Sequence, residues 1–402
     1  MEFKELQKWL GKVEDDHHDF KEHWYHHGQK PEMVKDIFSF VNTIHHDDCF
    51  LIVGVSDDRR ITGVENDGDN RLNQQKLIDF VRSLPISGEF IPKLQVETIF
   101  CGEHEVDVIR IFNTNNIPVY LGNRWNEKGL PKNGINPGQI FAREQDVNTA
   151  RDSTATYSQV EALWKKHFRM DVPIEERYLY NLSDTDSWTY SETDGAVFRY
   201  NLDPDFYMEL IEDDTKRFQA EAYSLDQVRT KMYWRLLNLK YRQNTIHQLL
   251  VVWLDGSRFL VVTPKFGFVK KAKEESLAYY YLTENSFEGK VQKLFETGLP
   301  LKADSGSMCN FYKGVVFYQS GEEKESVELE LDAQFNTVNR WITPTKEEIS
   351  SYQGIMMSDF SPDDHEIASG NVEYMLRQHK LGEIANLFLN AYRNNEATPN
   401  LG

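Results

Sequence analysis

The sequence predicts an α+β protein, in which an N-terminal mixed sheet with flanking helices is followed by a second mixed α/β region. Apolar residues recur at positions 3, 6, 10 and 13, which is helical spacing. Residues 50–55 form a short continuous apolar run that is typical of a buried strand. The predicted order of the first region, helix, helix, hairpin, helix, hairpin, strand and strand, is that of an α+β domain.

Each element of the first region has a local signal. Pro31 and Glu32 fit the first turn of a helix whose apolar stripe reaches Val41. A polar turn ends the apolar run, and a helix over 72–84 stops before Pro85. The remaining strands are bounded by turn residues. They are predicted over 61–64, 94–100, 106–112, 118–121 and 139–143.

The pattern predicts two main regions. Residues 1–152 form the first domain, 153–172 contain a connecting helix over 157–168, 173–393 form a mixed α/β C-terminal domain, and 394–402 are a polar tail. In the C-terminal domain we expect strands over 195–202, 247–253, 258–263, 314–319 and 326–331. Helices are expected there over 225–238, 372–379 and 381–390. No motif in this domain indicates its role.

Composition excludes several classes of protein. The three cysteines form no Cys-x-x-Cys pair, which argues against a disulfide framework or a cysteine zinc site and suits a reducing compartment. The N-terminus does not read as a signal peptide, and no apolar run is long enough to cross a membrane, so we expect a cytoplasmic protein. The net charge of −19 argues against a protein that coats DNA through its overall field.

Three carboxylates are the candidates for chemistry. Glu14 and Asp19 lie close in sequence, and Asp57 follows the buried strand. Carboxylates brought together bind Mg²⁺ or Mn²⁺, which can activate water for attack on a phosphodiester. Lys21 could then stabilise the charge that develops on the phosphate. The alternative is that these are solvated acidic residues, which are frequent in this chain.

Basic residues near this region offer a local groove for a phosphate backbone, against the overall negative charge. They are Arg59, Arg60, Arg124, Lys128, Lys132 and Arg143. The alternative is that these are scattered surface charges without a function.

Three histidines offer a possible zinc site. His23 with His26 or His27 has helical spacing that suits zinc, and the alternative for these histidines is a solvated loop.

Five motifs occur in one order over about residues 10–152. They are Glu14 followed by Asp19-Phe20-Lys21, then Ser39-Phe40-Val41-Asn42-Thr43, Leu51 to Asp58 with Gly54-Val55 inside it, Ile61-Thr62-Gly63-Val64, and Phe141-Ala142-Arg143 with Thr149-Ala150. In this order they resemble the Schlafen AlbA-2 domain. The resemblance implies a three-carboxylate nuclease site on Glu14, Asp19 and Asp57, with Lys21 beside it, that cleaves tRNA or rRNA.

The chain departs from the family pattern at two places. Asp19 stands where the family has glutamate, which withdraws the carboxylate by one methylene. Residues 44–49 replace a Gly-Gly pair, so that turn is rebuilt. The zinc site of vertebrate Schlafens has no counterpart among these cysteines.

These observations lead to two hypotheses. The first is a Schlafen-like, metal-dependent endoribonuclease acting on structured RNA such as tRNA, with a role in anti-phage defence as the expected context. A homodimer or a divergent second lobe would supply the other wall of its groove. The second is a non-catalytic nucleic-acid-binding or nucleotide-binding regulatory module with a C-terminal sensing domain.

Overall fold

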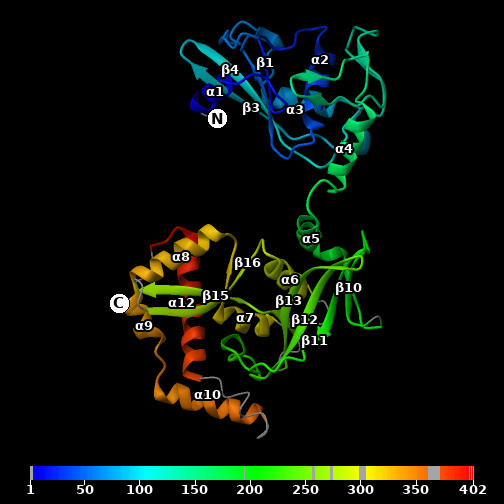
Figure 1. Cartoon of the computed structure of the whole chain (residues 1–402). Coiled ribbons are helices and arrows are strands. Elements are labelled where there is room, and N and C mark those ends of the chain that lie inside the picture. The colour runs from blue at the N-terminus through cyan, green and yellow to red at the C-terminus, as the bar shows by residue number, and fades with distance from the viewer. Residues whose placement is uncertain are drawn as a thin grey trace. The chain divides into compact units, whose positions relative to one another are not determined.

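The computed structural model describes residues 3–193, 195–255, 259–271, 275–297, 305–360, 372–397, 399 and 401. The chain divides into two compact units, Met1–Pro173 (unit 1) and Ile174–Gly402 (unit 2). Both units combine helices with sheets, so the α+β prediction is confirmed (Figure 1). Within the described residues, no helix is long and apolar enough to cross a bilayer.

Unit 1 is built around a four-stranded mixed sheet of order β1-β2-β4-β3. Strand β1 runs parallel to β2, whereas the β2/β4 and β3/β4 pairs are antiparallel. The elements of unit 1 are α1 (Phe3–Leu10), β1 (His18–Lys21), α2 (Lys30–Val41), β2 (Cys49–Val53), η1 (Gly68–Asn70), α3 (Gln74–Arg82), η2 (Ser87–Glu89), β3 (Leu94–Cys101), β4 (His104–Ile111), β5 (Trp125–Asn126), β6 (Gly134–Ile135), β7 (Arg143–Glu144), β8 (Val147–Asn148) and α4 (Tyr157–His167).

Alternation along the strands divides the core of unit 1 into two layers. Leu51 and Val53 pack with α2 and α3, while Ile52 packs with Leu6 of α1 on the opposite face. Because β1 pairs in register with β2, Asp19 lies beside Leu51 and Lys21 beside Val53. The side chains of Asp19 and Lys21 therefore leave the sheet on the face that α2 covers.

Helix α4 packs against the core of unit 1. Thr156 begins it with a capping box shared with Gln159. Leu163 is fully buried in the same cluster as α2 and α3. The Lys166 side chain is also buried, and its ammonium donates to the carbonyl oxygens of Thr43 and His45, the Thr43 bond being 2.9 Å long. The helix thus fixes the loop that follows α2.

Unit 2 contains a six-stranded antiparallel sheet of order β14-β13-β12-β11-β10-β9 and a three-stranded sheet of order β15-β16-β17. Its elements are α5 (Ile174–Ser183), η3 (Thr185–Ser187), β9 (Trp188–Ser191), β10 (Val197–Tyr200), β11 (Phe206–Glu212), η4 (Ala222–Ser224), β12 (Met232–Tyr241), β13 (Asn244–Leu254), β14 (Phe259–Val262), β15 (Lys265–Lys271), β16 (Glu275–Thr283), α6 (Phe287–Glu296), α7 (Ser305–Gly314), β17 (Val315–Tyr318), α8 (Gly321–Ala333), α9 (Phe335–Ile342), α10 (Lys346–Asp359) and α12 (Val372–Asn394).

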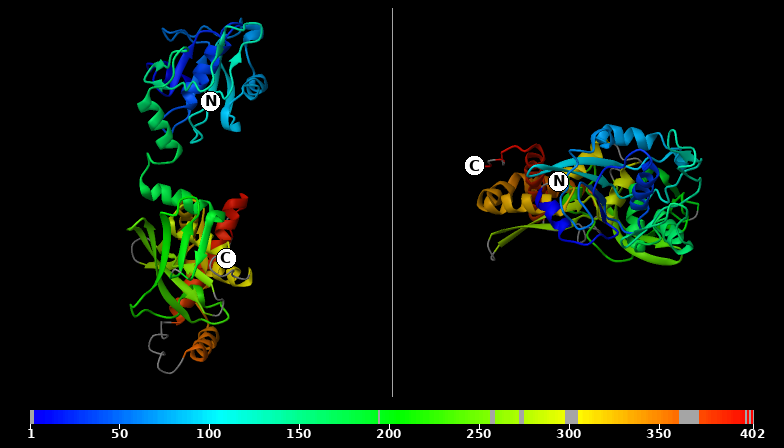
Figure 2. Two further views of the ribbon diagram at one scale, coloured as in Figure 1. Left: turned by 90° about the vertical axis from the view of Figure 1, so that its right-hand side faces the viewer. Right: turned by 90° about the horizontal axis from the view of Figure 1, so that it is seen from above.

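The long helix α12, red in Figures 1 and 2, organises the C-terminal half of unit 2. It contacts the strands β16 and β17 and the helices α7, α8, α9 and α10. Gly382 allows α12 to cross closely over the end of α7, because a Cβ at that position would lie 2.2 Å from the Gly314 carbonyl oxygen. Substitution of Gly382 by alanine would therefore force these two elements apart.

Two predicted elements of the C-terminal region are wrong. The helix expected over 225–238 is replaced by turns and by strand β12, which pairs with β11 and β13 on its two sides. The strand expected over 326–331 lies within helix α8, where Val327 and Leu331 are buried four residues apart and Leu329 is 69% exposed. Pairing with β11 and β13 favours the strand β12, and packing of Val327 and Leu331 in the core favours the helix α8, although the local sequence pattern predicted otherwise.

Three short strands predicted for unit 1 are reduced to single bridges. Ile61 bridges Val55 in place of a return strand, and Tyr120 bridges Ile140.

The predicted polar tail includes residues 398, 400 and 402, which lie outside the described residues. Leu401 accepts a hydrogen bond from Trp341 Nε1 through its carbonyl oxygen, at 2.5 Å.

Candidate functional site

Strand β1 brings Asp19 and Lys21 together at the edge of the sheet. Residues two apart on a strand point to the same side, so both side chains lie under α2. The Lys21 Nζ atom is 2.5 Å from Asp19 Oδ2. Asp19 is 3% exposed, so this ion pair is largely shielded from water. Burial lowers the pKa of Lys21, but the carboxylates of Asp19, Asp36 and Glu14 outweigh burial and raise it.

Glu14 precedes β1 and folds back onto it. One carboxylate oxygen of Glu14 accepts the backbone N–H of Phe20 at 2.9 Å. Burial raises the pKa of Glu14 to about 7, and the neighbouring Asp19 carboxylate adds to this shift. Glu14 therefore holds or releases a proton close to neutral pH, which is the property of a general acid or base.

Asp36 is the site residue that the sequence reasoning missed. It lies on α2 and is 3% exposed. Its carboxylate accepts the Tyr25 hydroxyl at 2.6 Å and the Asn148 amide at 2.8 Å, and lies 3.9 Å from Lys21 Nζ. The sequence held a signal, because the apolar residues Met33 and Phe40 lie three positions before and four after Asp36, on the same face of α2.

Glu14, Asp19, Lys21 and Asp36 line one hollow of about 650 Å³. Its other charged or histidine side chains are Glu22, His23, His26, Glu32, Lys35, Arg143 and Asp146. Carboxylates outnumber cations in this lining. A hollow of this composition suits a divalent cation or the charged groups of a polar ligand.

Arg143 contacts the carboxylate oxygen of Asp19 that does not face Lys21. Its Nη2 atom is 3.4 Å from Asp19 Oδ1, and its Nε atom donates to the Asp15 carbonyl oxygen at 2.7 Å. The guanidinium also lies 4.9 Å above the Phe40 ring. The Arg143 side chain is 1% exposed. Arg143 therefore positions Asp19 and Asp15 rather than lying on an open surface.

The comparison with known families decides what unit 1 is. The family model described as Schlafen, AlbA_2 matches residues 14–150. Unit 1 carries a Schlafen AlbA_2 domain. The match begins at Glu14 and includes Asp19, Lys21, Asp36 and Arg143. A search of curated proteins found none that matches this chain.

The Phe40-Val41-Asn42 motif of the AlbA_2 domain has a structural explanation. Asn42 is 1% exposed and ends α2. Its side chain donates to the carbonyl oxygens of Val119 and Phe141 and accepts the Val119 N–H at 2.6 Å. One amide thus ties the helix to two later segments of the domain. Arg143 follows the second of these segments, so Asn42 helps to place it.

Asp57, the third carboxylate suggested by the family motif, does not lie in the hollow of the AlbA_2 domain. It is in an exposed turn after β2, closed by a hydrogen bond from Ser56 N to the Arg60 carbonyl oxygen at 3.0 Å. Arg59 and Arg60 are exposed in the same turn, and Arg60 pairs with Asp58 at 2.7 Å. The structure brings Glu14, Asp19 and Lys21 together and leaves Asp57 outside the lining.

Arg124, Lys128 and Lys132 are exposed on the loop that carries β5 and β6. That loop is attached to the segment beside the hollow. Glu127 accepts the Gly28 N–H at 2.8 Å, and Asn133 donates to the Gly28 carbonyl oxygen at 2.7 Å. The neighbouring His26 lines the hollow. Three basic side chains therefore extend from a loop that borders the carboxylates.

The helical zinc arrangement of His23 with His26 or His27 is not formed, because this segment is not a helix. His23 pairs with Asp67 at 3.0 Å, and His27 contacts the Lys128 carbonyl oxygen at 3.2 Å. Among the described residues, two other groups could hold a metal ion: Asp16 with His17 and His45, and Asp226 with His379 and Glu383.

The second of these groups has a structural role in unit 2. Asp226 lies 3.4 Å from His379 Nε2 and 3.2 Å from the Lys313 ammonium, and accepts the Tyr352 hydroxyl at 3.1 Å. The hydrogen bond from His379 and the charge of Lys313 lower the pKa of Asp226. Because an ammonium group already neutralises this carboxylate, the group ties α7, α10 and α12 together.

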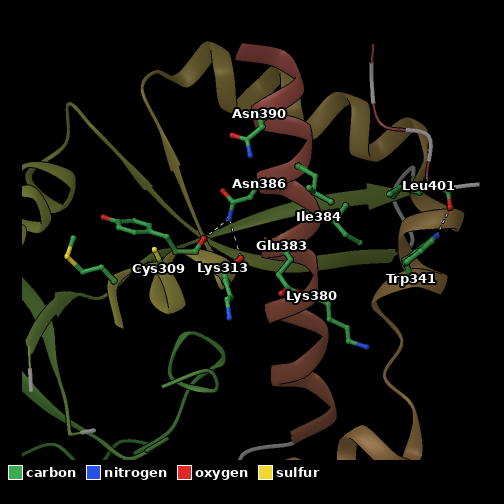
Figure 3. A pocket seen from close by; sticks show the side chains of 12 residues that line it. Cys309, Lys313, Trp341, Lys380, Glu383, Ile384, Asn386, Asn390 and Leu401 are labelled. Carbon is green, nitrogen blue, oxygen red and sulfur yellow. Dashed lines mark hydrogen bonds between the residues drawn. The ribbon is translucent and has the colours of Figure 1, made fainter. Parts of the chain in front are cut away.

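Unit 2 also has a hollow of about 1090 Å³ between α7 and α12 (Figure 3). Its lining is mainly apolar and includes Met308, Tyr312, Trp341, Ile384, Leu387 and Leu401. The Asn386 amide donates to the carbonyl oxygens of Tyr312 and Lys313 and so holds α12 against α7 (Figure 3). The size and lining are those of a small-molecule or peptide site.

Proposed function

We propose that this protein is a divalent-metal-dependent endoribonuclease that acts on structured RNA such as tRNA. The observation that carries the proposal is the arrangement of Glu14, Asp19 and Asp36 around the Lys21 ammonium in one hollow. The family match supports the coarser assignment, because Schlafen AlbA_2 domains can be nuclease-like.

The carboxylates of the hollow are the type of ligand that a hard divalent cation such as Mg²⁺ or Mn²⁺ prefers. Glu14, Asp19 and Asp36 do not form one of the groups of the described residues whose ligand atoms all lie within 4.8 Å of one another, so the side chains must move to share an ion. Lys21 now supplies one positive charge to Asp19 and, at longer range, to Asp36. Glu14 has a pKa of about 7 because burial and Asp19 disfavour its charged form. A divalent cation held by Glu14 and Asp19 would favour that charged form.

A bound metal ion would supply a polarised phosphoryl oxygen and a water of lowered pKa. The chain's own residues would do the rest. Glu14 would be in its charged form in the metal-bound site and would hold the ion together with Asp19. The Lys21 side chain is 31% exposed and can turn from Asp19 toward the phosphate, where its ammonium would offset developing negative charge. Arg143 would keep Asp19 oriented while Lys21 moves.

The third carboxylate has two candidates. Asp57 is the residue that the family motif indicates, and Asp36 is the residue inside the hollow. Conservative substitutions separate them, because Asp36→Asn and Asp57→Asn each remove one charge and keep the side-chain shape. The residue whose substitution lowers cleavage by about 100-fold is the metal ligand, and the other variant is its matched control.

RNA would be held by the exposed basic residues around the hollow. We assign this role to Arg59, Arg60, Arg124, Lys128 and Lys132, whereas the buried Arg143 cannot contact RNA and positions Asp19 instead. The net charge of −19 requires such a local surface, because the overall field repels a phosphate backbone. A homodimer would provide a second wall for the groove. An RNase that stops translation would suit defence against phage.

The deciding experiment incubates the purified full chain with total tRNA and Mn²⁺ or Mg²⁺. We expect discrete fragments that disappear with EDTA and in the Asp19→Asn variant. Asn at position 19 keeps the shape of the side chain, so a loss of cleavage reports the loss of charge. Intact tRNA under every divalent condition would contradict the proposal.

One observation favours a second function, a non-catalytic nucleic-acid-binding or regulatory module. Both carboxylate oxygens of Asp19 already face a cation, Lys21 on one side and Arg143 on the other. In that case the hollow of unit 2 would bind the ligand or partner that is sensed. A Glu14→Ala, Asp57→Ala double variant separates the two functions, because a pure binder should bind RNA more tightly after losing negative charge.

A further inference from the structure

We propose that Asp16, His17 and His45 form a zinc-binding site in unit 1 that is separate from the hollow. One ligand atom from each of Asp16, His17 and His45 lies within 4.8 Å of the other two. Two imidazoles and a carboxylate are a ligand set that Zn²⁺ prefers, in contrast to the all-oxygen set of Mg²⁺. This site therefore takes a different class of metal from the proposed nuclease site and does not depend on that proposal.

The sheet holds the two halves of the site side by side. Residues 16 and 17 precede β1, and residue 45 lies in the loop before β2. The parallel pairing of β1 with β2 and the hydrogen bond from Phe50 N to the His17 carbonyl oxygen, 2.8 Å, fix the distance between these segments. Because secondary structure already orders the segments, a metal ion would lose little of its binding free energy to ordering them.

The side chains of Asp16, His17 and His45 lie close together, and the stacked imidazole rings must turn for both to direct a nitrogen at one ion. His17 Nδ1 lies 2.8 Å from Asp16 Oδ1, and His17 Nε2 lies 3.5 Å from Asp47 Oδ2. The rings of His17 and His45 stack with centroids 4.0 Å apart. The side chains of His17, Asp16 and Asp47 are 32%, 45% and 79% exposed, so an ion can enter from solvent.

His45 is in the form that binds a metal. Its Nδ1 atom accepts the Asp47 N–H at 3.2 Å, so its Nε2 atom carries the proton and donates to the Asp16 carbonyl oxygen at 3.0 Å. A metal ion would replace the longer of these contacts at Nδ1. The ammonium of Lys166 donates to the His45 carbonyl oxygen and so helps to fix the position of this residue.

The site belongs to the part of the chain that departs from the family pattern. Residues 44–49 stand in place of the Gly-Gly turn, and they supply His45. A metal ion here would attach this rebuilt loop to the segment between Glu14 and Asp19. Its expected role is structural, because it would hold in place the segment that delivers both carboxylates to the hollow.

The test is zinc binding by the full chain after chelator treatment, with ZnCl₂ as the probe and calorimetry and metal analysis as readouts. We expect one Zn²⁺ per chain, and at least about tenfold weaker binding in the His45→Gln variant. His104→Gln is the matched control, because His104 also pairs with one carboxylate, Glu65 at 2.8 Å, and is 48% exposed. Asp36→Asn tests whether zinc instead enters the hollow.

Wild-type affinity in His45→Gln, or loss of zinc binding in Asp36→Asn, would overturn the proposal. Long-range ¹H–¹⁵N spectra of the histidine rings provide a measurement that needs no variant. Zinc should shift the ring signals of His17 and His45 and leave those of His104 unchanged. If zinc shifts the signals of any other histidine pair instead, the assignment is wrong.

Discussion

Lys21 and Asp19 leave β1 on the same face, and the ammonium nitrogen lies 2.5 Å from Asp19 Oδ2 in a hollow that also contains Asp36. A carboxylate that is 3% exposed would be costly to bury alone, and Lys21 removes most of that cost. In the proposed nuclease site, the same ammonium would compete with the divalent cation for Asp19.

Substitution of Lys21 by methionine should strengthen metal binding and weaken catalysis. Removing the competing ammonium should raise the Mn²⁺ affinity about tenfold, equivalent to about 1.4 kcal/mol. Cleavage of tRNA at saturating Mn²⁺ should fall about 100-fold, because a group that offsets transition-state charge is lost. Manganese titration by electron paramagnetic resonance and single-turnover cleavage measure the two effects. Lys30→Met is the control, since Lys30 donates to the Tyr25 carbonyl oxygen. Unchanged Mn²⁺ affinity in Lys21→Met would contradict the competition.

Glu14 should make the stability of the metal-free protein depend on pH. Its folded pKa of about 7 lies above the ordinary value of 4.5, so the folded state binds the proton more tightly than the unfolded state. Its favourable contribution is therefore complete below about pH 4.5 and is lost as the pH rises through 7. Thermal unfolding between these pH values should show Glu14→Gln gaining stability relative to the wild type as the pH rises. Parallel curves for the two proteins would exclude the raised pKa.

The basic loop should account for much of the salt dependence of RNA binding. Replacing Arg124, Lys128 and Lys132 together by alanine should weaken tRNA binding and reduce the slope of log K against log salt by about 2. The control replaces Lys216, Arg229 and Arg242 of unit 2, which are also exposed and carry the same total charge. Filter binding at several salt concentrations, without divalent ions, gives both slopes. Equal effects of the two triple variants would show that only total charge matters.

Asn42 should be important for the stability of the AlbA_2 domain. Alanine at this position leaves the Val119 N–H and two carbonyl oxygens unpaired in the core. We expect a loss of about 2–4 kcal/mol in the free energy of unfolding, measured in denaturant. Asn136→Ala should change it by less than about 0.5 kcal/mol, since Asn136 is exposed. A small effect of Asn42→Ala would show that the two segments are held by other contacts.

Asp226 should stabilise unit 2 at neutral pH. Its folded pKa lies below the ordinary value of 3.8, so its contribution is present above that pH and is lost as the pH falls further. Asp226→Asn should cost about 1–3 kcal/mol at pH 7, and the difference should shrink in acid. Glu383→Gln, which is 3.8 Å from His379 and 47% exposed, should have little effect. A cost for Asp226→Asn that does not vary with pH would contradict the ionic role.

Local patterns predicted α2 from its Pro31-Glu32 start and its apolar stripe at helical spacing, and β2 from a continuous apolar run. They failed at β12 and α8, where the buried positions depend on which neighbouring elements pack there. The metal site proposed around His45 shows a similar limit. Its ligands come from two segments that are separated by the whole of α2, and no spacing along the chain relates them.

The sequence by itself determined that about residues 10–152 carry the AlbA_2 motifs, with Glu14, Asp19 and Lys21 among them. It predicted no strand over residues 18–21, where β1 places Asp19 and Lys21 on one face of the sheet. Only the tertiary structure decided that α2 covers that face, so that Asp36 joins Glu14 and Asp19 in the hollow while Asp57 stays in an exposed turn. The physical reason is that periodicity sets the direction of a side chain about its own element. The distance between side chains on different elements is set by how those elements pack.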